Sequence, residues 1–334
     1  DSDVLEYLDD DGKKIEPRFF VPLLPMILIN GAEGIGSGWS TEVPLFQPVQ
    51  VLDSVEAYIR IEFEGSTEEP LVPRPWYRGF TGDVVDDENG GYFTRGRYHV
   101  SSDSREVHVT ELPIGAKESD DVVEDMKKKF VDNGGWASDV IQNTTDVWKT
   151  DILIKTSAAK LAGIDLDAML KLEKRLNLNN IHLWSRKGAL KKYTIHEIVC
   201  EHAEARIEFN QRRLNSQIEQ KEYALKLISA KRRYIAMVRG GTISMQTESK
   251  ETLIRQVEDA QFERHNASFD YLIGMPTYRL TDAEYEKLQV EELRLGRELC
   301  ELREMNPVVM WKRELNELRA DLAVYDARCQ GKRE

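Results

Sequence analysis

The residues with the clearest potential for binding chemistry lie in a glycine-rich stretch between positions 22 and 41. One branched apolar residue, Ile35, stands among four glycines that fall within eight positions: Gly31, Gly34, Gly36 and Gly38. Glycines permit positive φ angles and allow another molecule to approach the backbone closely. The apolar residues that precede them predict a strand running into a glycine loop, with Ile35 exposed in the loop.

Two interpretations of this loop follow from the residues alone. Glycine-rich loops cradle phosphate groups, which would indicate a nucleotide-binding enzyme. The stretch contains no lysine of the Walker type, however, and no helix is expected directly after the glycines. The other interpretation is that Ile35 is a small core residue beneath a tight turn.

Histidine and cysteine positions do not predict a metal site or a disulfide. The three cysteines, Cys200, Cys300 and Cys329, lie far apart, so a reducing compartment is the simpler interpretation. His196 and His202 are six positions apart on an expected helix, which places them on different faces. We therefore expect no metal ligands in this chain.

The net charge of −13 argues, taken alone, against a nucleic-acid surface. Local patches can still differ from the total, and basic residues cluster in two places, 186–192 and 231–239. Each cluster is either a DNA contact or a solvated face. No apolar run reaches the length of a membrane span and no secretion signal is present, so we expect no membrane partner. The absence of an initial Met suggests a piece of a longer protein.

Residues 19 to about 184 have the pattern of a mixed α/β region. Short apolar runs predict strands at 21–29, 92–100, 106–112, 151–154 and 177–184. Residues 49–60 and 120–132 predict helices, and Gly134-Gly135 predicts a loop.

From Thr194 onward the pattern becomes helical. Thr194 and Glu197 form a capping box that starts a long helix, and Gly240-Gly241 ends it. A seam at coiled-coil spacing runs along this helix: Leu214, Ile218, Leu225, Ile228 and Ile235. A second long helix starts near Thr281 and is interrupted at Pro307. An antiparallel coiled coil with a small helical head fits this pattern best, and a plain helical bundle is the alternative.

Six segments, in order along the whole chain, resemble type IIA DNA topoisomerases. The glycine-rich stretch, in its form with Trp39, is similar to the DNA-gate motif of the eukaryotic topoisomerase II branch rather than of bacterial gyrase. The other five segments are residues 5–17, 76–82, 109–113 (Val-Thr-Glu-Leu-Pro), 188–193 (Gly-Ala-Leu-Lys-Lys-Tyr) and 269–276. One departure is residues 277–279, Thr-Tyr-Arg, where the family has Leu-Trp-Ser. The short segment between 239 and 266 suggests a compact viral or protist version.

The resemblance implies an α+β fold, in which a mixed α/β tower-like domain precedes a long antiparallel coiled coil with a helical C-gate head. The implied segments are a DNA-gate segment at the end of the winged-helix region (1–48), the tower-like domain (49–193), the first coiled-coil helix (194–240), the C-gate dimerisation head (241–282) and the returning coiled-coil helices (283–330).

The resemblance also implies roles for individual residues. Ile35 is expected to wedge between DNA base pairs, since an inserted apolar side chain kinks the duplex and enlarges its contact with protein. The surrounding DNA-binding loop is Asn30, Gly31, Glu33, Gly34 and Gly36. The candidates for DNA backbone contacts are Arg186, Lys187, Lys191 and Lys192. The dimer gate is expected at Tyr271, Leu272, Met275, Tyr278 and Leu280, although some of these side chains fill the core of the head.

No catalytic residue is expected in this chain. The family nucleophile is a tyrosine directly after an arginine, and it should precede residue 1. The two Arg-Tyr pairs, with Tyr98 and Tyr234, are interpreted as packing or surface tyrosines. Mg²⁺ and ATP are implied for the full-length enzyme and neither for this fragment, which should be inactive alone because the Toprim and ATPase regions are absent.

The implied function is the DNA-binding, DNA-bending and dimer-gate part of an ATP-dependent type II topoisomerase. Double-stranded DNA and a second copy of the chain are the expected partners. The expected location is the nucleus for a cellular eukaryotic protein, or the host cytoplasm for a viral one. The alternative is a non-enzymatic coiled-coil scaffold with an α/β interaction domain, which explains the helical half and leaves the ordered motifs unexplained.

Overall fold

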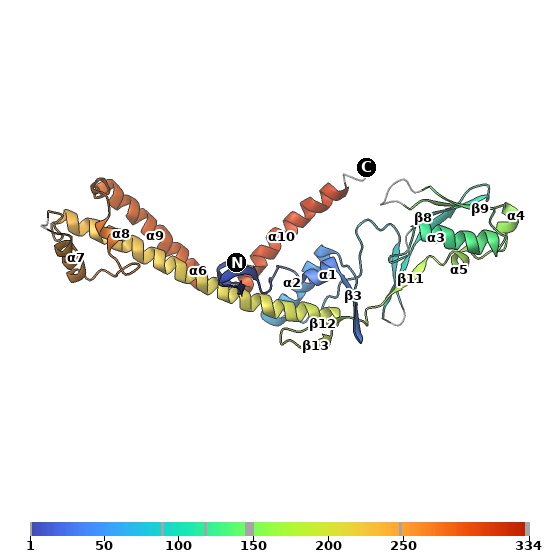
Figure 1. The fold of residues 1–334 in the computed structure, drawn as a ribbon, viewed down its shortest axis with the longest axis horizontal. Coiled ribbons are helices and arrows are strands. Elements are labelled where there is room, and N and C mark those ends of the chain that lie inside the picture. Colours follow the sequence, from blue (N-terminus) through green and yellow to red (C-terminus); the bar gives the residue numbers. More distant parts are fainter. Residues whose placement is uncertain (1, 88–89, 117–118, 144–149, 247–248, 331–334) are drawn as a thin grey trace. The chain divides into compact units, whose positions relative to one another are not determined.

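The structure, a computed structural model, describes residues 2–87, 90–116, 119–143, 150–246 and 249–330 (Figure 1). The chain forms two compact units that alternate along the sequence. The first unit holds residues 1–23 and 204–317, and the second holds residues 24–203 and 318–334. The five consecutive functional segments expected from the sequence stay a prediction, since these units do not follow their boundaries.

The second unit contains a four-stranded antiparallel sheet in the order β7-β8-β10-β9. Its strands are Arg97–Val100 (β7), Glu106–Glu111 (β8), Asp139–Gln142 (β9) and Ile152–Lys155 (β10). Helix α3 (Ser119–Met126) and the π-helix Lys127–Asp132 pack on this sheet. The alternating residues Val107 and Val109, with Ile152 and Ile154, are fully buried against Phe130. The strands expected at 106–112 and 151–154 and the helix expected at 120–132 are confirmed.

A three-stranded sheet in the order β11-β6-β5 lies in the same unit. Its strands are Asp83–Asp86 (β5), Tyr92–Arg95 (β6) and Glu173–Leu176 (β11), and two short helices, Ala158–Leu161 (α4) and Leu166–Leu170 (α5), precede β11. The single strand expected at 92–100 is therefore two strands. It divides at Gly96, whose N–H donates to the carbonyl of Leu172, and its halves enter different sheets.

The strand expected at 21–29 is wrong. Residues Met26–Asn30 form a short helix, α1, and the residues before it have no regular structure. Pro22 and Pro25 account for the difference, because proline cannot donate to a strand ladder, whereas Pro25 is tolerated at the start of a helix. The expected loop is also wrong, since the glycines lie in a hairpin formed by β3 (Ala32–Gly36) and β4 (Trp39–Val43).

Two further elements support this hairpin. Helix α2 (Pro48–Glu64) extends the helix expected at 49–60 and buries Val51, Leu52, Val55 and Ile59. The strand expected at 177–184 is confirmed only for β12 (His182–Trp184), which pairs with β13 (Leu190–Lys192). Residues 177–181 precede β12 without pairing in a sheet, and Ile181 is buried.

The first unit contains the antiparallel coiled coil. Helix α6 (Ile195–Arg239), which begins in the second unit, runs beside α9 (Asp282–Glu304), and ion pairs join the two helices in opposite directions. They connect Arg303 with Glu222, Lys221 with Glu298, Arg232 with Glu292, and Arg239 with Asp282. Both expected helix starts are confirmed, because Thr194 and Glu197 cap each other and the Thr281 hydroxyl accepts the N–H of Glu284 at 3.3 Å.

A small helical head connects these two helices. It contains α7 (Lys250–Asp259), α8 (Asp270–Ile273) and the 3-10 helix Thr277–Arg279. Its core consists of buried side chains from α6 and from the connecting segments: Tyr234, Ile243, Val257, Phe262, Phe269 and Leu272. The first unit also holds the 3-10 helix Ser2–Val4 and the hairpin of β1 (Tyr7–Asp10) and β2 (Lys13–Pro17).

The last helix, α10 (Pro307–Gln330), does not extend the coiled coil along its whole length. In the first unit, Glu314 pairs with Arg206 and Arg213 of α6. In the second unit, Arg319 pairs with Asp53 and Glu56 of α2 instead. The expected returning coiled coil at 283–330 is therefore corrected for residues 319–330, because the acidic face of α2 supplies their partners.

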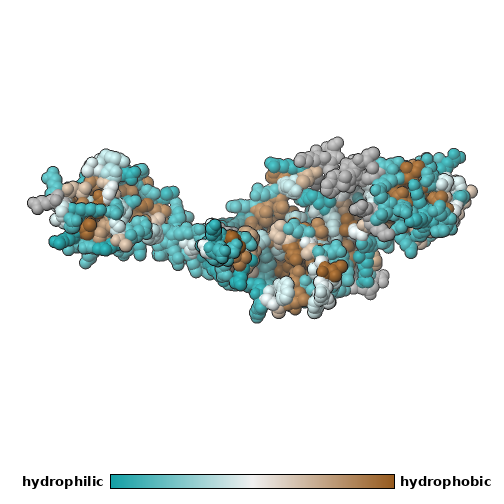
Figure 2. Space-filling model, in the orientation of Figure 1, coloured by the Kyte–Doolittle hydropathy of each residue, from teal (hydrophilic) through white to brown (hydrophobic). Residues whose placement is uncertain are grey.

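Hydrophilic residues cover much of the face in Figure 2, and hydrophobic residues form separate patches between them. Within the described part of the chain, no helix combines the length and apolar character needed to cross a bilayer.

Candidate nucleic-acid interface

The wedge hairpin, defined here as β3, β4 and the turn between them (residues 32–43), presents Ile35 at its end. Ile35 pairs with Ser40, and Gly36 pairs with Trp39, so only Ser37 and Gly38 form the turn. Gly38 has φ of 83°, in the left-handed region that favours glycine. Ile35 is 92% exposed. The interpretation of Ile35 as a core residue is therefore wrong, because its side chain has almost no protein around it.

Alternation along the two strands separates the side chains onto two faces. Glu33 and Ile35 share one face with their cross-strand partners Ser40 and Glu42. Gly34 and Gly36 share the opposite face with Thr41 and Trp39. A face that carries two glycines leaves the backbone accessible to a large ligand.

Gly31 differs from these two glycines, because the fold itself requires it. It lies between α1 and β3 with φ of 67°, and a Cβ atom there would lie 2.8 Å from both the Val43 carbonyl oxygen and Leu45 Cδ1. At Gly34 and Gly36, the nearest atoms to an added Cβ would be at 4.0 and 3.6 Å, which is ordinary contact. Asn30, the last residue of α1, is exposed.

A second hairpin lies directly beside the wedge hairpin. We call it the basic hairpin, and it comprises β12, β13 and the turn between them (residues 182–192). The Glu42 N–H donates to the Asn180 carbonyl at 2.8 Å, and the His182 N–H donates to the Thr41 hydroxyl at 3.2 Å. His182 Nδ1 lies 3.0 Å from the Ser40 carbonyl oxygen, so Nδ1 carries the proton of this contact. Residues about 140 positions apart in sequence thus form one surface.

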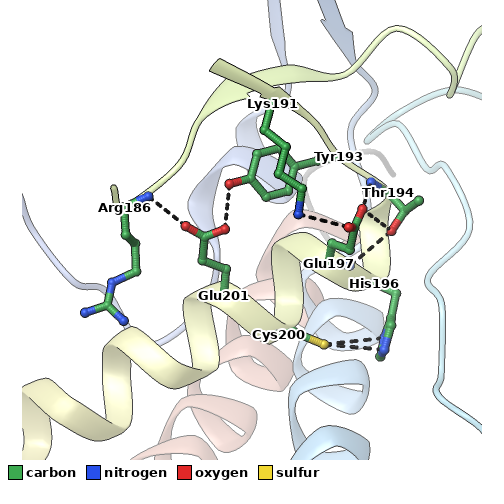
Figure 3. Close-up of polar contacts among 8 residues, drawn as sticks. All are labelled: Arg186, Lys191, Tyr193, Thr194, His196, Glu197, Cys200 and Glu201. Carbon is green, nitrogen blue, oxygen red and sulfur yellow. Dashed lines mark hydrogen bonds and ion pairs between the residues drawn. The ribbon is translucent and has the colours of Figure 1, made fainter. Parts of the chain in front are cut away.

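The four basic candidates lie together on the basic hairpin but differ in their surroundings. Arg186 and Lys187 lie in its turn, and both are exposed, as are Lys191 and Lys192 of β13. Figure 3 shows Lys191 directed at the first turn of α6, where its Nζ lies 3.0 Å from a Glu197 oxygen. Lys192 is its neighbour on the strand and therefore occupies the opposite face.

Two carboxylates of α6 hold the basic hairpin in place (Figure 3). Glu201 accepts the backbone N–H of Arg186 at 2.7 Å and the hydroxyl of Tyr193 at 2.5 Å. Burial opposes the charge of Glu201, but these two hydrogen bonds outweigh burial and keep its pKa below the ordinary value. Burial, together with the Glu201 carboxylate, raises the pKa of Tyr193 to about 12.

Glu197 is the second carboxylate. It accepts the backbone N–H of Thr194 at 2.8 Å, and it also receives Lys191. The Thr194 backbone bond, followed by the Lys191 contact and the Thr194 hydroxyl bond, lowers the pKa of Glu197 to about 2. Neither Glu197 nor Glu201 was identified from the sequence as a support for the basic cluster, although the capping box had already placed Glu197 near Thr194.

The residues expected at the dimer gate divide between core and surface. Leu272 is fully buried in the head, so it is removed from the proposed contact, because it would reach a partner only if the head opened. Tyr271 and Leu280 pack against the same core, and the Tyr271 hydroxyl donates to the Glu263 carbonyl at 2.9 Å. Met275 is half-buried, whereas Tyr278 is 71% exposed.

Both tyrosines that follow an arginine are packing residues. Tyr234 is fully buried in the head core, and its hydroxyl lies 3.3 Å from Met245 Sδ. Tyr98 lies on β7, packs against the core of the four-stranded sheet and donates to an Asp167 oxygen at 2.9 Å. Within the described residues, no group of three His, Cys, Asp or Glu side chains could hold a metal ion.

Sequence reasoning missed the second aromatic contribution to this surface. Trp184, the last residue of β12, is 74% exposed, and Trp39 is 57% exposed. The Trp39 ring meets the His182 ring edge-on, with centroids 5.0 Å apart. The alternation at residues 182–184 could have placed His182 and Trp184 on one face, but no local pattern predicts that Trp39 lies beside them.

Comparison with known proteins places this geometry in a family. The DNA gyrase/topoisomerase IV family matches residues 1–316, and the chain belongs to that family. Similar curated proteins carry the name DNA topoisomerase 2. The one from Arabidopsis thaliana is 26% identical over 97% of this chain and 24% of its own length.

Two further relatives extend this likeness. DNA topoisomerase 2 of Penicillium chrysogenum is 28% identical, and the alignment covers 95% of this chain and 22% of the relative. DNA topoisomerase 2 of Acanthamoeba polyphaga mimivirus is 26% identical, with coverage of 95% and 30%. The chain thus spans between about a fifth and a third of the length of these relatives.

A solved structure has the same fold. The crystal structure of the Plasmodium falciparum topoisomerase II DNA-binding, cleavage and re-ligation domain superposes with a TM-score of 0.81 at 25% sequence identity, over 99% of this chain and 48% of that one. The α+β fold with a long coiled coil, expected from the sequence, is confirmed by this match. The resemblance to the eukaryotic branch is confirmed by the names of the relatives.

Proposed function

We propose that this chain is the DNA-binding, DNA-bending and dimer-gate part of an ATP-dependent type II topoisomerase, which passes one DNA duplex through a transient double-strand break in another. The observation that carries this proposal is the position of Ile35. An isoleucine that is 92% exposed at the end of a two-residue turn, beside a hairpin with four basic residues, has the arrangement of an intercalating wedge.

The physical argument combines an apolar tip with a cationic neighbour. Insertion of an apolar side chain at a base step costs a few kcal/mol of unstacking and produces a bent duplex that contacts more protein. Lysine and arginine contacts to phosphates hold the duplex in register without reading its sequence. Lys187 and Lys192 suit that role, because both are exposed and, among the described residues, neither has an ion-pair partner.

The head supplies the proposed dimer gate. After Leu272 is assigned to the core, Tyr278 is the largest apolar surface of the expected set, with Met275 half-buried beside it. A twofold contact places the same residues of both copies against each other, and aromatic and Met side chains are enriched in such contacts.

The chemistry of strand cleavage is assigned in this proposal to residues outside the 334, and the chain alone does not cut DNA. Mg²⁺ and ATP belong to that same assignment. The described residues do not fit a metal site, and no step proposed for this chain passes through either group. The proposed location is the nucleus, or the host cytoplasm if the protein is viral. The non-enzymatic scaffold is not supported, since the relatives reported above are named topoisomerases.

A bending assay tests the proposal directly. Duplex DNA labelled at both ends reports its bend by Förster transfer when the full-length natural protein binds. Ile35→Ala should reduce the bend while circular dichroism and thermal unfolding stay as in the wild type, since the side chain contacts almost no protein. Leu71→Ala is the matched control, because it removes an exposed aliphatic side chain of the same unit. Normal binding with an unchanged bend in Ile35→Ala would remove the wedge from the proposal.

A further inference from the structure

Trp184 is an exposed tryptophan that neither the sequence motifs nor the proposed wedge explains. It is 74% exposed at the end of β12, next to the turn that carries Arg186 and Lys187. Large aromatic side chains are usually buried, and an exposed one within a cationic surface indicates a contact with another molecule.

Cross-strand pairing gives the neighbours of Trp184 on its own face. His182 pairs with Lys192, and Trp184 pairs with Leu190, so these four side chains share one face of the basic hairpin. Lys191 lies on the other face, where Glu197 and the Tyr193 ring hold its ammonium group. The cation available beside Trp184 is therefore Lys192.

This aromatic face continues onto the wedge hairpin. The contact between His182 and Trp39 joins the two hairpins, and Trp39 shares its face with Gly34 and Gly36. The carboxylates of Glu33 and Glu42 lie on the opposite face of the wedge hairpin. The combined face thus offers aromatic rings, exposed backbone and the Lys192 ammonium group, a composition complementary to a polyanion with flat apolar groups.

The hydrogen bonds between the hairpins also give their relative direction. Asn180 lies opposite Glu42, and His182 lies opposite Ser40 and Thr41, so β12 runs antiparallel to β4. Continued by two residues, this register brings Trp184 to the level of Gly38, in the turn of the wedge hairpin. Trp184 and Ile35 therefore lie toward the same end of the two-hairpin surface.

We propose that Trp184 is a second apolar DNA contact, which packs its ring against the sugars and base edges of the duplex beside the step that Ile35 opens. This inference rests on the proposed function, because it places the duplex at the wedge hairpin. Its occupant is double-stranded DNA, since the cationic neighbours match phosphates and a kinked duplex exposes base faces and sugar edges that stack on aromatic rings.

Binding to duplex DNA across a range of salt concentrations tests the inference in the full-length natural protein. Trp184→Ala should weaken binding roughly fivefold or more, as the loss of one aromatic stacking contact does. The slope of log Kd against log salt should stay unchanged, because no charge is removed. Trp184→Phe should restore most of the affinity. Phe63→Ala is the matched control, since Phe63 is an aromatic residue of the same unit, 50% exposed, at the end of α2.

Quenching of tryptophan fluorescence gives an independent readout. The difference between the wild type and Trp184→Phe isolates the emission of Trp184, which acrylamide should quench in the free protein and quench less in the DNA complex. Protection of Trp184 without DNA would overturn the inference, because another part of the protein would then cover the ring.

The outcomes separate this inference from the proposed function. A wild type that does not bind duplex DNA overturns both. A wild type that binds, with a bend that depends on Ile35 and with Trp184→Ala as tight as Phe63→Ala, overturns only the role of Trp184. Weakened binding in Trp184→Ala, rescue in Trp184→Phe and protection by DNA together establish it.

Discussion

Replacement of single glycines in and beside the wedge hairpin should separate those that the fold requires from those that a ligand requires. Gly31→Ala places a Cβ 2.8 Å from the Val43 carbonyl oxygen, in a residue with φ of 67°. A non-glycine residue in this region costs on the order of 1–3 kcal/mol. The overlap with backbone adds to that cost, because the carbonyl cannot rotate away as a side chain would. We expect Gly31→Ala to lower the free energy of unfolding by about 3 kcal/mol.

Gly34→Ala and Gly36→Ala should behave in the opposite way. An added Cβ at these positions meets only ordinary contacts, at 4.0 and 3.6 Å, and neither residue has a positive φ. Alanine loses less conformational entropy than glycine on folding, so each change should leave stability unchanged or raise it by up to about 1 kcal/mol. The methyl groups would nevertheless stand on the face shared with Trp39, and DNA bending should decrease.

Urea unfolding followed by circular dichroism measures the first effect, and the Förster-transfer bending assay measures the second. The expected result is a crossed pattern, in which Gly31→Ala loses stability and the other two variants lose bending without losing stability. Gly31→Ala as stable as the wild type would refute the steric reasoning. Wild-type bending in both Gly34→Ala and Gly36→Ala would show that DNA does not approach this face.

Four further variants test the remaining assignments. Lys192→Ala should flatten the slope of log Kd against log salt by about one unit, and an unchanged slope would make Lys192 a solvated residue. Glu314→Ala leaves Arg206, which is 2% exposed, without its carboxylate partner and should lower stability by about 3 kcal/mol, measured by urea unfolding. The pKa of Glu197 is about 2, below its ordinary value of 4.5, so its contribution is complete above pH 4.5 and disappears as the pH falls toward 2. Glu197→Gln should therefore flatten the pH dependence of stability between pH 2 and 4.5, and an unchanged profile would contradict this assignment. Tyr278→Asp should weaken the dimer in analytical ultracentrifugation without unfolding the head, and an equally tight dimer would exclude Tyr278 from the gate.

The helical half of the chain was predictable because its signals are local. A capping pair marks each long helix start, and paired glycines mark the end of α6, so the sequence places α6 and α9 almost to the residue. The partner of α10 was not predictable in the same way. The seam that includes Leu315 has coiled-coil spacing, but Arg319 meets carboxylates from α2, about 265 residues earlier in the chain.

The site was predictable as a set of residues and not as a surface. The family motif identified Ile35 and its glycines, but a glycine-rich strand has too few side chains to show the alternation from which strands are recognised. The hairpin was therefore expected as a loop. Its contact with the basic hairpin depends on hydrogen bonds from Asn180 and His182 to β4, and such long-range pairing leaves no pattern in a single sequence.

The net charge of −13 was the main sequence argument against DNA binding, and the structure shows why it does not decide the question. Electrostatic interactions between exposed charges are screened over about 8–10 Å at physiological salt, so the field at the basic hairpin depends on nearby groups rather than on the total. Glu197 and Glu201, the acidic residues nearest to it in sequence, are already engaged by Thr194, Lys191, Tyr193 and the Arg186 backbone. Many other carboxylates are neutralised along the coiled coil, in ion pairs between α6 and α9. Acidic residues thus position the cationic surface, and they leave Lys187 and Lys192 exposed for the phosphates that the proposed function requires.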